Sequence, residues 1–231
     1  EHASRGIDAL HEAELAVTSH QNVLKGRLRL SLPPSFEPWW ELLAAFQREH
    51  PDIQVVVYTT ERAVDLSMEG VDIALRIGPV VHESLVAKRL VRYRHVLVAS
   101  PEYLERRKVP RRPRDLERHA LVQFTGLSPT PEWRFDAEGD DERVAFRPAF
   151  VTNSADAAIG HAERGGGIAM ALSYQVADAV RRGALRVVLA RFEPPPLPIQ
   201  LVYPAARLVS ASLRAFVDLA VETRSWSFVE G

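Results

Sequence analysis

The sequence contains no cysteine, although the chain is 231 residues long. This absence excludes disulfides, thiolate metal sites and a cysteine nucleophile. It is consistent with a reducing compartment. The first fifteen residues, EHASRGIDALHEAEL, are polar and contain no apolar core of the kind found in secretion signals. We therefore expect a cytoplasmic protein.

Long apolar runs are also missing. No stretch approaches the roughly 20 apolar residues of a membrane-spanning helix, so we expect no membrane partner. Neither sign of charge is in excess, because 29 basic residues face 30 acidic ones and the net charge is −1. Proteins that bind DNA on their own usually carry a basic face, so this chain alone is not expected to bind DNA. The basic segment 106–119 could track phosphates, but its acids and its lack of aromatics favour a solvated loop and helix start.

Catalytic motifs are a third absence. The eight histidines form neither HxH nor HExxH, so the spacing of zinc ligands is missing. The chain has no GxSxG motif for a hydrolase serine and no GxxxxGK[ST] motif for a nucleotide phosphate. We therefore expect no catalytic residue, no metal and no cofactor. An enzyme would need an acid–base pair, for which Glu37 and Glu61 are the nearest candidates.

Alternating and helical apolar patterns are present along most of the chain. The first part predicts strand, helix, strand, helix and strand, at 26–32, 36–50, 53–59, 63–69 and 71–77. Further strands are predicted at 94–100, 121–124, 144–151, 168–172, 185–189 and 199–203, with intervening helices, an irregular segment at 128–141 and a last helix from 210. This order predicts an α/β fold with two doubly wound lobes. We assign 26–100 and 204–231 to the first lobe and 101–203 to the second.

Residues 1–25 predict a separate helix. Leu10, Val17 and Leu24 recur at a spacing of seven, and Ile7 begins a second set at the same spacing, in which Glu14 and Gln21 are polar. An amphipathic helix on the surface of one molecule would explain this pattern. The alternative is the end of a linker helix that pairs with a second copy of the chain.

Loops at the carboxyl ends of the predicted parallel strands form the candidate binding site, because ligands of open α/β sheets bind there. Two of these loops begin helices, whose free N–H groups favour a carboxylate. Ser35, Asn153 and Ser154 could also serve only as helix caps, and the triple glycine could be only a tight turn. The candidate residues are Pro34, Ser35, Phe36, Thr59, Thr60, Ile77, Gly78, Phe124, Thr152, Asn153, Ser154 and Gly167.

Several segments, taken together, resemble one known family. GRLRLSLPPSF, TTERAVDLSMEGVDIALRIG, VLVASPEYL, WRF at 133–135, GGGIAM and IQLVYPAARLVSASLRAFVDLAVE occur in the order and spacing of the sensing domain of LysR-type transcriptional regulators. The resemblance covers 26 to about 223, and residues 1–25 resemble the end of that family's linker helix.

The resemblance implies a fold like type 2 periplasmic binding proteins, with a small-molecule effector held in a cleft between two Rossmann-like lobes. The two predicted helix starts in the candidate site indicate that this effector is an acid. It also implies dimers or tetramers, and DNA binding only through an N-terminal winged helix-turn-helix outside this chain. Two alternatives share the fold: a periplasmic-type solute-binding protein and a dehydratase-like enzyme. The linker-like helix at 1–25 favours the regulator.

Overall fold

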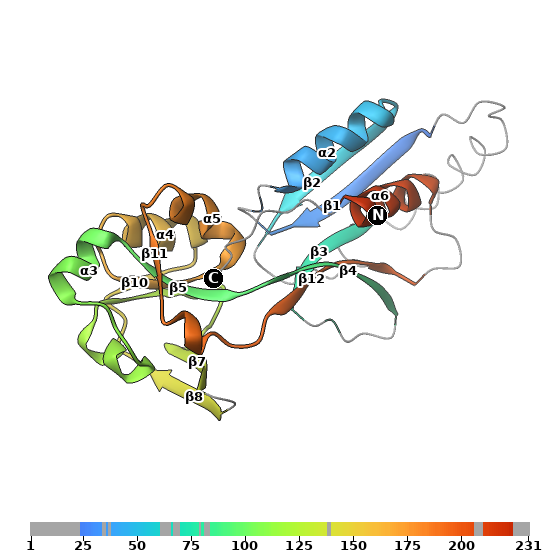
Figure 1. The fold of residues 1–231 in the computed structure, drawn as a ribbon. Coiled ribbons are helices and arrows are strands. Elements are labelled where there is room, and N and C mark those ends of the chain that lie inside the picture. The colour runs from blue at the N-terminus through green and yellow to red at the C-terminus, as the bar shows by residue number, and fades with distance from the viewer. Residues whose placement is uncertain are drawn as a thin grey trace. The chain divides into compact units, whose positions relative to one another are not determined.

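The computed structural model describes residues 24–33, 36, 38–60, 66, 70–78, 80, 84–137, 140–205 and 210–223. They form two compact units (Figure 1). Unit 1 takes the described residues up to Val91 and those from Ile199 onward, and unit 2 takes Arg92–Pro198. The predicted linker helix at 1–25 and the predicted helix at 63–69 lie almost wholly outside the described residues. Among the described helices, none has the length and apolar character needed to cross a membrane.

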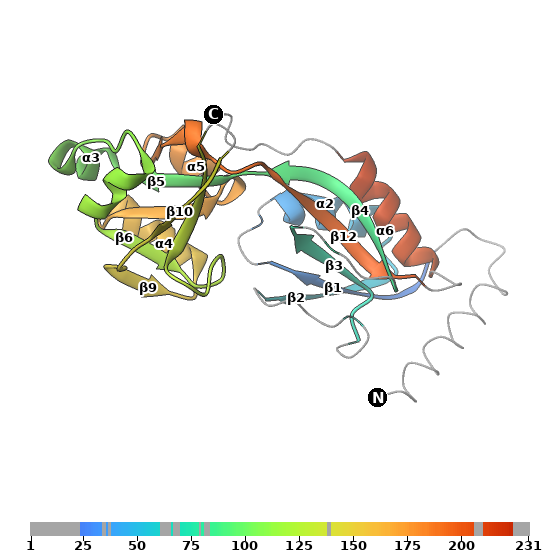
Figure 2. The ribbon, with the colours of Figure 1, turned by 90° about the horizontal axis from the view of Figure 1, so that it is seen from below.

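Unit 1 is built on a five-stranded sheet with the order β2-β1-β3-β12-β4. Its first three strands run parallel, as predicted, and β12 runs antiparallel to β3. Figure 2 shows β2, β1 and β3 side by side. The strands are β1 Gly26–Leu32, β2 Ile53–Thr59, β3 Ile73–Ile77, β4 Leu85–Tyr93 and β12 Leu197–Pro204, and the helices are α2 Pro38–Glu49 and α6 Ala211–Glu222.

The core of unit 1 follows from the alternation in β1. Leu28 and Leu30 are fully buried, because residues two apart point to the same face of a strand. Aromatic rings join the two helices, since Phe216 of α6 makes edge contacts with Trp39 at 5.5 Å and Phe46 at 5.1 Å. These contacts hold α2 against α6.

Unit 2 has its own five-stranded sheet, in the order β11-β5-β10-β6-β9. β6 runs parallel to both β9 and β10, whereas β5 is antiparallel to β10 and β11. The elements are β5 His95–Ala99, α3 Pro101–Arg107, η1 Pro113–Arg118, β6 Leu121–Phe124, β7 Glu132–Ala137, β8 Asp140–Ala145, β9 Phe150–Thr152, α4 Ala155–Glu163, β10 Ile168–Leu172, α5 Ser173–Arg181, β11 Arg186–Val188 and η2 Ala190–Phe192.

Two apolar clusters cover the two faces of this second sheet. The helix-face cluster joins Val96, Val98 and Ala169 to residues of α4 and α5, such as Ala158 and Val176. The hairpin-face cluster joins alternate residues of the same strands to Trp133 and Phe135 of β7 and to Tyr103 of α3. The sheet is therefore covered by helices on one face and largely by the β7–β8 hairpin on the other.

The structure corrects three features of the sequence prediction. The segment 128–141 is not irregular, because β7 pairs with β8 in an antiparallel hairpin. The predicted strand at 144–151 is wrong as a single element: β8 ends at Ala145 and β9 begins at Phe150. Pro148 stands between them and has no N–H to donate to a strand ladder. β4 was not predicted at all, since four of its nine residues are Lys or Arg or Tyr and no clean alternation marks it.

Candidate functional site

In unit 1 the candidate residues gather at the carboxyl edge of the sheet. Leu32, the last residue of β1, pairs in register with Thr59, the last residue of β2. Thr60 continues this pairing, because its N–H donates to the carbonyl of Leu32 at 2.9 Å. Thr59 is exposed and Thr60 is half-buried. Two hydroxyl side chains therefore lie beside the end of β1, as the parallel topology predicted.

The end of β3 lies at the same edge. Gly78 has φ +91°, a conformation that glycine adopts readily, and its carbonyl accepts a hydrogen bond from Gln200 Nε2 at 2.9 Å. This bond ties the turn after Ile77 to β12. Phe36 is 2% exposed and packs on Trp39, with ring centroids 6.3 Å apart, so most of its surface belongs to the core. Pro34 and Ser35 lie outside the described residues.

In unit 2 the parallel pairing of β6 and β9 sets Phe124 directly beside Thr152. The Thr152 hydroxyl accepts from the N–H of Ser154 at 3.1 Å, and the Ser154 hydroxyl accepts from the N–H of Ala157 at 3.3 Å. Ser154 is thus the N-cap of α4, one of the roles expected from the sequence. Asn153 is exposed between them. The positive end of the helix dipole at this helix start suits the position to an acceptor.

Gly167 is not brought together with the other candidates. It immediately precedes β10, whose first residue pairs with Leu121 at the amino end of β6. Phe124 and Thr152 lie at the opposite, carboxyl edge of the same sheet. A Cβ at Gly167 would lie 2.4 Å from the carbonyl oxygen of Ala120, and φ is +151°. The glycine is needed for a close backbone approach, which is the tight-turn role that the sequence also allowed.

Ser31 is a residue that the sequence analysis did not select. It lies one residue before the end of β1, in register with Tyr58 of β2 and Ala74 of β3. Its side chain is 1% exposed, and its hydroxyl has no hydrogen-bond partner among the described residues. A buried hydroxyl without a partner is unusual. The sequence could have pointed to Ser31, because it is the one serine on a strand otherwise made of Leu, Arg and Gly and it lies next to a predicted ligand-binding loop.

The two carboxyl edges share a simple chemistry. Their described candidate side chains are hydroxyls, an amide and apolar groups, and none of them titrates. No group of three or more His, Asp or Glu side chains suited to a metal ion occurs within the described ranges. Each edge by itself can bind a polar molecule through hydrogen bonds to hydroxyls and backbone N–H groups.

The sequence matches the family model described as "LysR substrate binding domain" over residues 21–225. It is 33% identical over 227 residues to an HTH-type transcriptional regulator of Xanthomonas campestris pv. campestris (strain 8004), covering 96% of this chain and 66% of that protein. It is 31% identical over 218 residues to the HTH-type transcriptional regulator PtxR of Pseudomonas aeruginosa, covering 94% of this chain and 70% of that protein. The chain therefore spans about two thirds of the length of the curated relatives it matches.

Solved structures of regulatory domains have a similar fold. The regulatory domain of CrgA from Neisseria meningitidis is 27% identical, with a TM-score of 0.77 over 87% of this chain and 100% of that chain. The regulatory domain of AphB from Vibrio vulnificus is 23% identical, with a TM-score of 0.72 over 85% of this chain and 98% of that chain. At that identity the second likeness concerns the fold alone. Together they confirm the predicted α/β fold class, similar to type 2 periplasmic binding proteins.

Proposed function

Since the chain belongs to the LysR substrate-binding-domain family, we propose that it senses a small organic acid and relays its binding to a DNA-binding domain outside this chain. This chain is the effector-binding domain of a LysR-type transcriptional regulator, and its relatives are transcriptional regulators. We propose in addition that the ligand is acidic, that it contacts the residues named below, and that its binding is relayed to the DNA-binding domain.

The observation that carries the proposed ligand class is the capped start of α4. Ser154 caps this helix by accepting from the Ala157 N–H, and the positive end of the helix dipole at the same position favours an anion. Thr59 and Thr60 in unit 1 supply hydroxyl groups at the end of parallel strands. That one ligand engages residues of both units is part of the proposal.

We assign Thr59, Thr60, Ile77, Gly78, Phe124, Thr152, Asn153 and Ser154 to this role, together with Pro34, Ser35 and Phe36 from the sequence. Gly167 is left out because of its place at the other edge of the sheet. The proposal also includes self-association to a dimer or tetramer, DNA contact only through a domain outside this chain, and a cytoplasmic location. Catalysis by Glu37 or Glu61 has no support in the relatives, which are named as transcriptional regulators.

Matched acids and amides test the ligand class. A panel of small carboxylic acids and their primary amides is screened by thermal shift, and hits are measured by calorimetry. We expect at least one acid to raise the melting temperature while its amide does not, because only the acid is stabilised by the helix dipole. If no acid binds, or if amides bind equally well, the acidic part of the proposal is wrong.

Charge substitutions then test the residues. Asp caps a helix as well as Ser does, so Ser154→Asp is expected to fold normally, while its charge repels a bound carboxylate. For charges about 5 Å apart near a protein surface, screened repulsion of roughly 1–2 kcal/mol corresponds to an affinity loss of about five- to thirtyfold. Thr60→Asp is expected to have a similar effect if the ligand also contacts unit 1. Ser210→Asp, at the N-cap of α6, is the matched control and is expected to bind normally. Full affinity in both test variants would refute this site.

A further inference from the structure

Unit 2 contains a cavity of about 550 Å³, and none of the residues that line it is among the candidate effector residues described above. Its walls include Trp133 and Phe135 of β7, Met170 of β10, His95 at the start of β5, and the segment from Pro194 to Leu197. All of these residues belong to unit 2. The volume lies within the range of about 300–1,000 Å³ that is typical of small-molecule sites.

The cavity lies on a different face of the sheet from the start of α4. Trp133, Phe135 and Met170 belong to the hairpin-face cluster or pack against it. The candidate effector residue Phe124, and Ala155 next to Ser154, belong to the helix-face cluster. Leu127, which also lines the cavity, packs against the helix-face cluster. A ligand held by Trp133, Phe135 and Met170 would nevertheless bind on the hairpin face, whereas the start of α4 lies on the helix face.

The walls of the cavity are mainly apolar. Trp133 and Phe135 are 4% and 3% exposed, so each ring is anchored in the core. Trp133 is held further by Phe146, with ring centroids 4.5 Å apart. Rigid aromatic walls favour flat apolar ligands, and the flexible thioether of Met170 can adapt to their shape.

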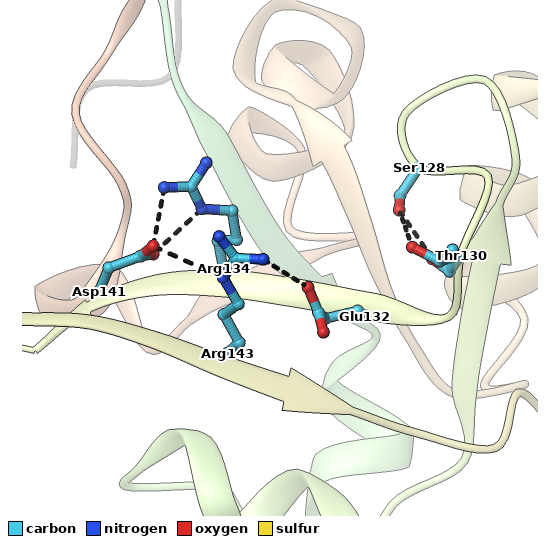
Figure 3. A network of polar contacts seen from close by, with 6 residues as sticks. All are labelled: Ser128, Thr130, Glu132, Arg134, Asp141 and Arg143. Carbon is cyan, nitrogen blue, oxygen red and sulfur yellow. Dashed lines mark hydrogen bonds and ion pairs between the residues drawn. The ribbon is translucent and has the colours of Figure 1, made fainter.

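The charged groups at the hairpin compensate one another. Arg134 donates twice to Asp141, at 3.0 and 2.8 Å, and the Arg143 guanidinium lies 3.6 Å from Asp141 and 3.5 Å from Glu132. Figure 3 shows these two cations and two anions as one connected network along the hairpin. Its bond to Arg134 lowers the pKa of Asp141 below the ordinary value, so this carboxylate stays charged and paired. No uncompensated cation within this network is left to attract a carboxylate.

His95 supplies a neutral polar group in the wall. Burial lowers its pKa to about 4, so the imidazole is uncharged at neutral pH. Its ring touches the ring of Tyr93 edge-on, with centroids 5.3 Å apart. Within the described part of the chain, its ring nitrogens have no hydrogen-bond partner. A neutral imidazole offers one donor and one acceptor, which suits a hydroxyl group.

We infer that this cavity is a second ligand site, which takes an uncharged aromatic molecule with a single hydroxyl or similar hydrogen-bonding group. The apolar walls would bury the rings and His95 would pair with the polar group. An anion is disfavoured there, because it would lose its hydration without meeting a free cation. This cavity therefore prefers an uncharged ligand, whereas the proposed acid site prefers an anion.

Three related probes test this inference by equilibrium dialysis at about pH 7.5: 2-naphthol, naphthalene and 2-naphthoate. We expect 2-naphthol to bind at one site per chain. Naphthalene is expected to bind about fivefold more weakly, because it lacks one neutral hydrogen bond. 2-Naphthoate is expected to bind at least tenfold more weakly than 2-naphthol. Absence of saturable 2-naphthol binding up to about 1 mM, or equal binding of 2-naphthoate, would overturn the inference.

Two variants locate the site. His95→Phe keeps an aromatic ring against Tyr93 but removes the hydrogen bond to the ligand. The affinity for 2-naphthol is therefore expected to fall to that for naphthalene, and the affinity for naphthalene is expected to stay unchanged. Met170→Trp is expected to fill the cavity and weaken both probes at least tenfold. His161→Phe is the control, since this histidine stacks on Phe150 at 4.2 Å outside the cavity. Circular dichroism checks that each variant folds.

The two proposed sites can fail independently. Ser154→Asp is expected to leave 2-naphthol binding unchanged, because the hairpin-face cavity does not include Ser154. Loss of 2-naphthol binding in that variant, or unchanged binding in both His95→Phe and Met170→Trp, would refute the second site. Failure of every carboxylic acid to bind would leave it standing.

Discussion

The buried imidazole of His95 makes the stability of unit 2 depend on pH. Burial lowers its pKa from the ordinary value of 6.5 to about 4 in the folded chain. The folded chain therefore resists protonation at this residue, whereas the unfolded chain accepts the proton readily. The stabilising contribution is complete above pH 6.5 and is lost as the pH falls from 6.5 toward 4.

The size of this effect follows from the two pKa values. A tenfold change in a protonation equilibrium corresponds to about 1.4 kcal/mol. Lowering the pH from about 7.5 to about 5 then costs about 2 kcal/mol of unfolding free energy through His95 alone, since the unfolded imidazole is mostly protonated at pH 5 and the folded one is not. Carboxyl groups elsewhere also titrate, so the contribution has to be isolated by a variant.

His95→Phe provides that variant. Its ring cannot be protonated and can keep the edge contact with Tyr93. Urea unfolding of the parent and the variant, followed by circular dichroism at both pH values, measures the difference. We expect the parent to lose about 2 kcal/mol more than His95→Phe on acidification. The control variant His161→Phe is expected to follow the parent. Equal losses in the parent and His95→Phe, within about 0.5 kcal/mol, would refute the reasoning.

Two further predictions concern backbone packing and DNA. Gly167→Ala is expected to lower the free energy of unfolding, measured in urea, by more than about 2 kcal/mol, because the added Cβ would meet the carbonyl of Ala120. Gly183→Ala is the control: its Cβ meets nothing within 4 Å, so only the φ of +75° costs stability, about 1 kcal/mol. Similar losses of stability in the two variants would contradict this account. The chain alone, with its net charge of −1, is expected not to bind duplex DNA specifically in a gel-shift assay, and nanomolar sequence-specific binding would overturn the domain assignment.

The fold class could be predicted because local patterns carry most of it. The leucines of GRLRLSL alternate as a half-buried strand requires, and the structure buries Leu28, Leu30 and Leu32. Ser154 was one of two candidate caps, with Asn153, because both residue types compete well for the first N–H groups of a helix, and the structure selects Ser154. Family membership followed from several weak segments occurring in one order, and the family model confirms it.

Local pattern failed where it was weak or interrupted. The hairpin strand β7 does alternate, with Trp133 and Phe135 buried between polar residues, but prolines and glycines around it indicated a loop. β4 carries charges on an edge strand and shows no alternation. β4 is held by β12, which lies about a hundred residues further along the chain, so a short window of sequence does not contain its partner. β7 pairs with β8 across a short turn, but its buried rings pack on residues of other strands that are distant in the chain.

The sequence by itself determined the α/β class, the absence of cysteine chemistry and the membership of the family, because composition, periodicity and motif order are properties of the chain alone. Only the tertiary structure decided which candidates lie together. Strand pairing set Phe124 beside Thr152 and moved Gly167 to the opposite edge of the same sheet. It also brought residues of the β7–β8 hairpin, His95 and Met170 together as the walls of one cavity. The edges of a sheet and the walls of a cavity are formed by strands that are distant in the sequence. The register in which those strands pair is set by packing across the whole unit.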